Sequence, residues 1–462
     1  MKNLNNFLVK GVFFLSTLFF MFSCTANEED LLGSDDDDTE TPETPGGEEE
    51  EAEDISITST YVISEDETWE SGITVNWGGH VVIEEGVTLT IEPGVKVLAN
   101  KTAAPEFYIK GNLHALGTAD EPIYVTVPEA DRTEANIFNL QAWGGFICTS
   151  TAKTFVMDHV VMEFGNATLT DDHISIQEGV VDMEVGEPSY GFYSENPETK
   201  VIVHNSVVAY MSDDAFRPQG GQVSFYNNVF AYIGSTGGEA LNIKKGTTGD
   251  IAYNLFYHIA TNGPKWSNKS GVDVQTNINA YNNTIVSGGW RRNKSGRGGS
   301  VNIEETARGM IVNNMIVNCR YGVRVVGDAL EGTNVDMENT TIDNQYYYGN
   351  HARMTSEFAP SNGFLTEIAE NSIAGNDPMF ENYDVVNEFT ISLTTEDDEF
   401  PTPNEDKTFD EWTKFDFHLK SGSPALDAGS VNVEPMYGSI SVAGKTYTVP
   451  RSADYIGAFG TK

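Results

Sequence analysis

Five short segments decide the fold: VIVHNSVVAY (201–210), VSFYNNVFAY (223–232), IAYNLFYHI (251–259), NAYNNTIVSG (279–288) and MIVNNMIVNC (310–319). They align on Asn205, Asn227, Asn254, Asn282 and Asn313, at spacings of 22, 27, 28 and 31 residues. A second asparagine follows three of these, at Asn228, Asn283 and Asn314. Repeats of this length predict a solenoid of short strands, in which each coil stacks on the previous one about 4.8 Å away.

The recurring asparagine has a physical role at a tight bend, because its side-chain amide can donate to one coil and accept from the next. This pattern resembles the asparagine ladder of right-handed parallel β-helices in the pectate-lyase-like superfamily. Segments 79–99, 111–127 and 142–167 resemble the opening coils of secreted bacterial β-helix proteins, and segments 417–430 and 453–460 resemble their closing part. We therefore predict an all-β protein: a single-stranded right-handed parallel β-helix solenoid with an asparagine ladder.

The amino terminus carries an export signal. Lys2 and Lys10 precede the apolar run Gly11–Phe22, which is too short to span a bilayer but is typical of a secretory signal. Ser23-Cys24 resembles the lipobox of bacterial lipoproteins, although Met21 and Phe22 depart from its usual spelling. The resemblance implies that Cys24 is lipidated and becomes the first mature residue. An ordinary signal peptide cleaved nearby is the alternative.

The stretch after Cys24 is strongly acidic. Residues 25–54 contain 15 Asp and Glu and no Lys or Arg, so this stretch cannot bury a core and should be a solvated tether. It resembles the surface-export signal of Bacteroidota-type lipoproteins, which implies an outer-membrane, surface-exposed protein; a spacer facing the periplasm is the alternative. We thus divide the chain into signal peptide (1–23), tether (24–54), β-helix coils (55–344) and C-terminal coils with a cap (345–462).

Charge and cysteine content limit the partners. The net charge is −42, and residues 55–462 alone carry −29, which argues against a nucleic-acid partner because phosphates require a basic patch. Cys148 and Cys319 lie several coils apart in the predicted solenoid, beyond disulfide reach, and we expect two free buried thiols. We expect a monomer anchored to the outer membrane.

A polar strip follows from the register of the second strand in each repeat. These strands are predicted at AFRPQ (215–219), ALNIK (240–244), GVDVQ (271–275), SVNIE (300–304) and GVRVV (322–326). Their second and fourth residues are mostly apolar and should point inward, so the third and fifth should point outward. The outward side chains include Arg217, Asn242, Asp273, Asn302 and Arg324, with Lys244, Gln275 and Glu304 beside them.

Two loops next to this strip add aromatic and basic side chains. TNGPKWSNKSG (261–271) contains Trp266, and GGWRRNKSGRGG (288–299) contains Trp290, Arg291 and Arg292 in the only dense basic cluster of an acidic chain. Exposed tryptophans could stack on sugar rings, and cations could attract an anionic glycan. We predict that Asn242, Asn302, Gln275, Trp266, Trp290, Arg291 and Arg292 bind an extracellular polysaccharide.

Catalysis at the strip remains open. A lyase needs a base and a group that neutralises the uronate: Arg217, Lys244 or Arg324 could serve, and Asp273 or Glu304 could hold Ca²⁺. A hydrolase needs two carboxylates, for which Asp273 and Glu304 on adjacent predicted coils, or Asp213 and Asp214, are candidates. The full signatures of known pectate lyases and polygalacturonases are absent. A non-catalytic adhesin or structural surface protein is therefore the alternative to an enzyme.

Overall fold

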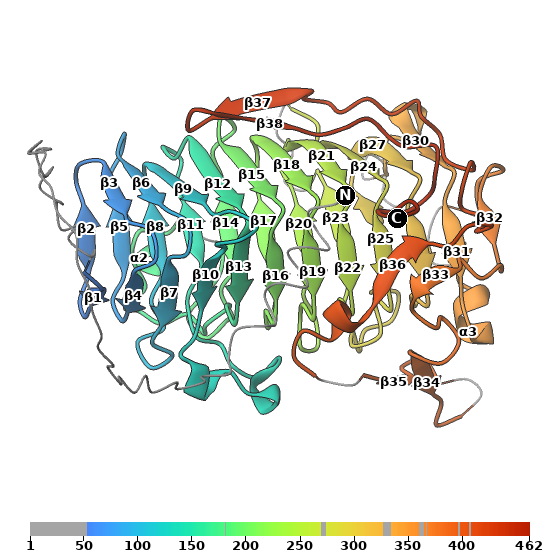
Figure 1. Cartoon of the computed structure of the whole chain (residues 1–462), viewed down its shortest axis with the longest axis horizontal. Helices are drawn as coiled ribbons and strands as arrows, with labels where there is room; N and C mark the ends of the chain where they lie inside the picture. Colours follow the sequence, from blue (N-terminus) through green and yellow to red (C-terminus); the bar gives the residue numbers. More distant parts are fainter. Residues whose placement is uncertain are drawn as a thin grey trace, which may run out of the picture.

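The computed structural model describes residues 53–180, 182–268, 274–326, 334–359, 365, 367–395, 398–405 and 408–462. Its strands form three long parallel sheets that share one axis, and each coil except the last two contributes one strand to each sheet in turn (Figure 1). The protein is a right-handed parallel β-helix, as the sequence predicted, and this handedness is the one that parallel crossovers adopt.

We name the sheets A, B and C in the order in which a coil enters them. Sheet A consists of β1 (Ile55–Ile57), β4 (Thr74–Trp77), β7 (Lys96–Ala99), β10 (Ile123–Thr126), β13 (Val160–Glu163), β16 (Val207–Ala209), β19 (Val229–Ala231), β22 (Leu255–Tyr257), β25 (Thr284–Val286), β28 (Met315–Val317), β31 (Tyr346–Tyr348) and β32 (Ile373–Ala374). Sheet B consists of β2 (Tyr61–Ile63), β5 (Val81–Ile83), β8 (Phe107–Ile109), β11 (Phe146–Cys148), β14 (Phe192–Ser194), β17 (Phe216–Pro218), β20 (Leu241–Ile243), β23 (Pro264–Ser267), β26 (Asn302–Glu304) and β29 (Arg324–Val326). Sheet C consists of β3 (Glu67–Trp69), β6 (Thr88–Ile91), β9 (Asn112–Leu116), β12 (Thr154–Asp158), β15 (Lys200–His204), β18 (Gln222–Tyr226), β21 (Thr248–Ala252), β24 (Asn277–Tyr281), β27 (Arg308–Val312) and β30 (Thr340–Asp343).

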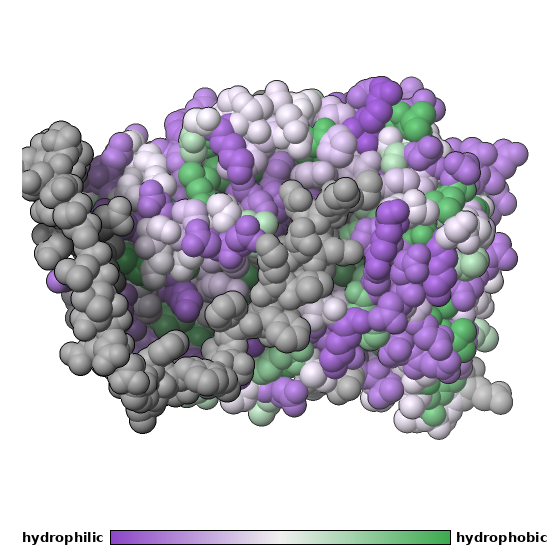
Figure 2. All heavy atoms as spheres, viewed as in Figure 1, coloured by the Kyte–Doolittle hydropathy of each residue, from purple (hydrophilic) through white to green (hydrophobic). Residues whose placement is uncertain are grey.

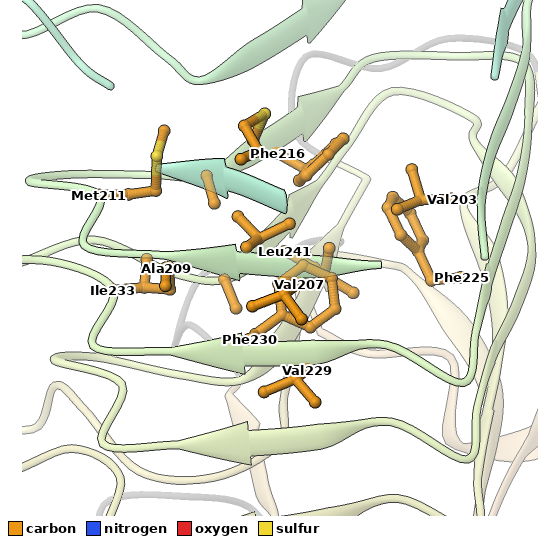
Figure 3. Packing of buried hydrophobic residues seen from close by; sticks show 14 of the residues in the cluster. Val203, Val207, Ala209, Met211, Phe216, Phe225, Val229, Phe230, Ile233 and Leu241 are labelled. Atoms are coloured by element: carbon orange, nitrogen blue, oxygen red, sulfur yellow. The ribbon is translucent and has the colours of Figure 1, made fainter. Parts of the chain in front are cut away.

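The core fills the space between the sheets with stacked apolar side chains. In Figure 3, Val207 of β16 lies above its neighbour Val229 of β19, and Phe216 of β17 pairs with Leu241 of β20. All these side chains are buried. Equivalent strand positions thus point inward in successive coils, and this burial explains why apolar residues alternate with polar ones along the strands.

The asparagine ladder lies at the bend between sheets C and A. Asn228, Asn254, Asn283 and Asn314 are fully buried, and each amide nitrogen of the first three donates to the oxygen of the next at 2.9–3.0 Å. The same oxygen also accepts the backbone N–H of the preceding ladder asparagine, at 3.0 Å between Asn254 and Asn228. The ladder satisfies the buried polar groups of a bend that water cannot reach.

The ladder is offset by one residue from the alignment of the sequence repeats. Asn205, Asn227, Asn282 and Asn313 precede the ladder positions and adopt a left-handed backbone, with φ between 49° and 58°. In the coil of β21 and β22 this left-handed position is Tyr253, so Asn254 belongs with Asn228 rather than with Asn227. Both positions favour asparagine, for different reasons. At the bend position asparagine tolerates the left-handed backbone, and at the ladder position its amide bridges neighbouring coils.

The chain after β32 runs back along the flanks of the solenoid (Figure 1). It forms three antiparallel pairs: β33 (Phe380–Asn382) with β36 (Asp416–Leu419), β34 (Thr390–Ser392) with β35 (Thr402–Asn404), and β37 (Ser439–Val442) with β38 (Lys445–Thr448). The last hairpin packs on sheet C, where Ile440, Val442 and Tyr447 contact Val156 and Ile202. Two short helices, α2 (Ile174–Gln177) and α3 (Ala352–Thr355), lie in excursions from the coils.

The two cysteines are free and buried, which confirms the prediction from the sequence. Burial raises the pKa of both thiols, that of Cys319 to about 12. Within the described residues, no helix is long and apolar enough to cross a membrane. Hydrophilic side chains dominate the described part of the face shown in Figure 2.

Candidate functional site

A column of polar side chains follows the outer face of sheet B through five coils. The register aligns Arg217 of β17 with Asn242 of β20, then Lys265 of β23, Asn302 of β26 and Arg324 of β29. Sequence reasoning placed four of these five residues in this column. We call these five residues the sheet B column.

The third member was predicted wrongly. The strand between β20 and β26 is Pro264–Ser267 and not GVDVQ, so Lys265 occupies the place expected for Asp273. Asp273 lies outside the described residues. Pro264 made this segment an unfavourable strand candidate, but it stands at the first position, where a missing N–H is tolerated. Gln275 also lies outside sheet B, and its amide donates to Asp336 at 3.1 Å.

An acidic side chain precedes the strand in each of two neighbouring coils at one edge of the column. Asp214 comes two residues before β17, and Glu239 occupies the same place before β20. The backbone N–H of Glu239 donates to Asp214 at 2.8 Å, and the amide of Asn242 donates to the same carboxylate at 2.6 Å. Sequence reasoning noted Asp213 and Asp214 but missed Glu239. The shared pattern of acid, alanine and strand in DAFR and EALN could have found it.

Lys265 joins this acidic edge to the next acidic residue of the site. Its ammonium lies 3.5 Å from Glu239 Oε1 and 3.5 Å from Glu304 Oε2. Glu304 also accepts from Asn302 at 2.6 Å and from Arg297 at 3.3 Å. Arg297 belongs to the basic loop 288–299, which therefore lies against the column. The side chain of Arg297 is 44% exposed, whereas Asn302 is only 1% exposed.

The carboxyl groups of the site titrate at very different pH values. Burial raises the pKa of Glu239 to about 8, and burial together with the charge of Asp214 raises that of Asp213 to about 7. Burial acts in the same direction on Asp214 and Glu304, but hydrogen bonds and neighbouring cations outweigh it and lower both pKa values. Near neutral pH the site thus combines a protonated Glu239 with ionised carboxylates, the pattern that acid–base chemistry uses.

Several buried polar atoms in and beside sheet B have no hydrogen-bond partner among the described residues. They are the side-chain oxygens of Asn242 and Asn262 and both polar atoms of Gln219, and the Nε of Arg217 is also unpaired. The four ladder amides, by contrast, are all hydrogen-bonded. Unsatisfied buried polar atoms cost stability, and the described residues carry others away from the column, such as Trp77 Nε1 and Tyr447 Oη.

Both tryptophans predicted to contact a glycan are buried. Trp266 points into the core from β23, is 0% exposed and donates its indole N–H to Arg308 O at 3.0 Å. Trp290 packs against Phe389 and donates to Asn318 O at 2.8 Å. The prediction that they are exposed is wrong. It was made because the Gly, Lys and Arg residues that flank both tryptophans are typical of surface loops. Neither side chain can stack on a sugar in this structure.

The basic loop is anchored by the returning C-terminal segment. Arg291 pairs with Glu405 at 2.6 Å and donates to the carbonyl oxygens of Ile233, Gly234 and His258 at 2.8–3.1 Å. It is thus committed to fixing the loop rather than to binding a ligand. Arg292 donates to Thr236 O at 3.4 Å and is half-buried. Lys244 follows β20 beside Gln219, in the outward column next to the sheet B column.

The described residues do not fit a calcium ion at Glu304. Its two oxygens already face Asn302, Arg297 and Lys265, and two of these three are cations. Calcium requires six to eight oxygen ligands. In the described ranges there is also no cluster of three or more His, Cys, Asp or Glu side chains that could hold a metal ion.

Residues 61–174 match a family model described as a pectate-lyase like beta helix domain. No curated protein and no solved structure gives a significant match. The matched coils include β2 to β13 and end before Asp214, so the match covers the opening of the solenoid and not the sheet B column. Residues 61–174 thus resemble a pectate-lyase-like β-helix domain, which supports a polysaccharide-related role.

Proposed function

We propose that the protein binds an anionic polysaccharide along the sheet B column and cleaves it by acid–base catalysis. One observation carries the proposal: Lys265 lies between Glu239 and Glu304, whose pKa values are shifted in opposite directions. The partly exposed cations of the column, Arg217 and Lys265, would attract the polymer.

The arrangement favours hydrolysis over elimination. A protonated Glu239 can donate to the leaving oxygen, and ionised Glu304 can assist water or attack the sugar carbon. Each carboxylate has an oxygen 3.5 Å from the same nitrogen, so these oxygens are at most twice 3.5 Å, or 7.0 Å, apart. Glycosidases hold their two carboxyl groups roughly 5–9.5 Å apart.

A non-catalytic surface protein is the second candidate, and one observation favours it. The carboxylates of the site are already paired with cations of the same site, and Asn302 and Arg324 are almost fully buried. Such a network could simply hold the basic loop on the solenoid while the outer surface binds a partner.

We also propose that the protein hangs from the outer membrane by a lipidated Cys24, exposed to the medium. The lipobox-like Ser23-Cys24 and the acidic tether support this proposal. Replacing Cys24 with Ser should release the protein from the membrane fraction. Protease added to intact cells should remove the wild-type protein; resistance would place it in the periplasm.

Activity is tested by incubating the purified protein with polygalacturonate, alginate and hyaluronan. New reducing ends without unsaturated sugars are expected, and Glu239→Gln should abolish them. Unsaturated ends would contradict the assignment of Glu239 as acid. Retention in an affinity gel without any new ends would favour the non-catalytic protein, and no retention would overturn the proposal.

A further inference from the structure

The charges of the sheet B column alternate from coil to coil. Cations stand on β17, β23 and β29 as Arg217, Lys265 and Arg324, and amides stand on the coils between them as Asn242 and Asn302. Neighbouring strands of a parallel sheet are about 4.8 Å apart. The cations therefore recur about every 9.6 Å along the solenoid axis, twice the strand spacing.

This alternation is confined to one half of sheet B. The same outward position carries Val82, Tyr108, Ile147 and Tyr193 on the four coils before β17. Those side chains are buried under the excursion that contains Leu169 and Met183. The polar stretch is thus bounded at its N-terminal end and extends over five coils, long enough for about two disaccharide units of a polymer aligned with the axis.

The amide coils are unsuited to an anion. Asn242 donates its amide N–H to Asp214 at 2.6 Å, and its own oxygen is buried. Asn302 likewise donates to Glu304 at 2.6 Å. A ligand carboxylate at these coils would lie beside a protein carboxylate and be repelled, whereas a ligand hydroxyl could donate to that carboxylate.

The coils that carry a cation in the sheet B column, by contrast, are suited to bind an anion. The guanidinium of Arg217 lies over the Tyr190 ring at 4.3 Å, 3.4 Å from Asp182 and 3.5 Å from Asp214. Lys265 lies 3.5 Å from each of its two carboxylate partners, longer than a good charge-assisted hydrogen bond. The column therefore attracts anions at alternate coils and disfavours them between.

We propose that the ligand is a polysaccharide whose repeat is a disaccharide of one acidic and one uncharged sugar. One pyranose of an extended chain is comparable in length to one coil, so acidic sugars would meet Arg217 and Lys265, whose side chains are partly exposed, and an uncharged sugar would lie between them at the coil of Asn242. This inference rests on the proposed binding at the sheet B column and specifies its substrate class.

The test compares three polymers at one ionic strength with the purified protein. Hyaluronan alternates a uronic acid with an uncharged amino sugar, every sugar of polygalacturonate is acidic, and dextran is neutral. We expect hyaluronan to bind at least roughly tenfold more tightly than polygalacturonate, with no binding to dextran; roughly tenfold corresponds to about 1.4 kcal/mol. Equal or tighter binding of polygalacturonate would overturn the alternating repeat and leave the proposed function standing. Binding of neither acidic polymer would overturn both.

A double exchange tests the spacing itself. Asn242→Lys combined with Lys265→Asn keeps the composition and net charge but moves one cation by a coil. The preference for hyaluronan over polygalacturonate should shrink or reverse. Lys200→Gln, which removes a cation from sheet C, is the matched control and should leave the preference unchanged. Should the double variant fail to fold, the comparison of polymers with the wild-type protein decides alone.

Discussion

The backbone N–H of Glu239 donates a 2.8 Å hydrogen bond to the carboxylate of Asp214, so acidic side chains from successive coils meet at the edge of sheet B. The two residues occupy equivalent places ahead of β20 and β17. Burial and this proximity raise the pKa of Glu239 to about 8, while that of Asp214 is lowered. A solenoid creates such pairs readily, because stacking brings equivalent positions within about 5 Å.

The proton on Glu239 should control the pH dependence of cleavage. With a pKa of about 8, Glu239 is protonated below that value and loses its proton above it. We expect kcat/KM to fall as pH rises through about 8 and Glu239→Gln to be inactive at all pH values. The pH–rate profile of the wild type measures this. Activity that increases between pH 7 and 9 would contradict the role of Glu239 as an acid.

The ladder should be a major source of stability. Asn254→Ala removes an amide that bonds to both neighbouring coils and leaves buried partners unsatisfied. We expect a loss of about 1–3 kcal/mol in the free energy of unfolding, measured by urea denaturation. Asn371→Ala, which removes an exposed hydrogen bond to Asp343, is the control and should cost less than about 0.5 kcal/mol. Similar losses at both sites would refute a special role for the ladder.

Trp266 should contribute to stability rather than to direct glycan contact. Its side chain is fully buried in the core, and Trp266→Phe keeps much of its apolar volume while removing the bond to Arg308 O. Trp266→Ala should lower the free energy of unfolding by about 3–5 kcal/mol, and Trp266→Phe by less. If Trp266→Phe keeps the wild-type Tm but loses glycan binding, the result would contradict the conclusion that Trp266 is buried away from the glycan.

The contact between Glu405 and Arg291 should make stability sensitive to acid. Burial acts to raise the pKa of Glu405, but Arg291 and His258 outweigh it and hold it at about 2. A depressed carboxyl pKa contributes stability above its unfolded value of about 4.3, and this contribution is lost as pH falls toward 2. Glu405→Gln leaves Arg291 without a counter-charge and should cost about 3–5 kcal/mol at pH 7 and much less near pH 2.

The control for that prediction is Glu399→Gln. Glu399 is exposed in the same returning segment, and only its backbone carbonyl contacts Arg320. This variant should leave the free energy of unfolding within about 0.5 kcal/mol of wild type at both pH values. A cost for Glu405→Gln that is independent of pH would show that the charge of Glu405 does not matter.

The repeats predicted the solenoid because inward and outward positions alternate in every strand, whatever the length of the loops. Four of the five column residues follow from that alternation. Lys265 could not be predicted, since two competing segments, PKWS and GVDVQ, lie in one interval and only the packing of Trp266 into the core decides between them. The role of Glu405 was equally inaccessible, because its partner Arg291 is 114 residues away.

The most direct test of the central claim is the affinity of the purified protein for an acidic polysaccharide after loss of one cation from the sheet B column. Arg217→Gln removes a cation of the column on the strand next to that of Asn242, and Lys200→Gln removes one from sheet C. With Tm unchanged in both, we predict that Arg217→Gln weakens binding about tenfold or more, consistent with loss of a charged hydrogen bond, and that Lys200→Gln changes it less than about twofold. Equal weakening by the two variants, or unchanged binding by Arg217→Gln, would contradict the claim that the glycan lies on sheet B.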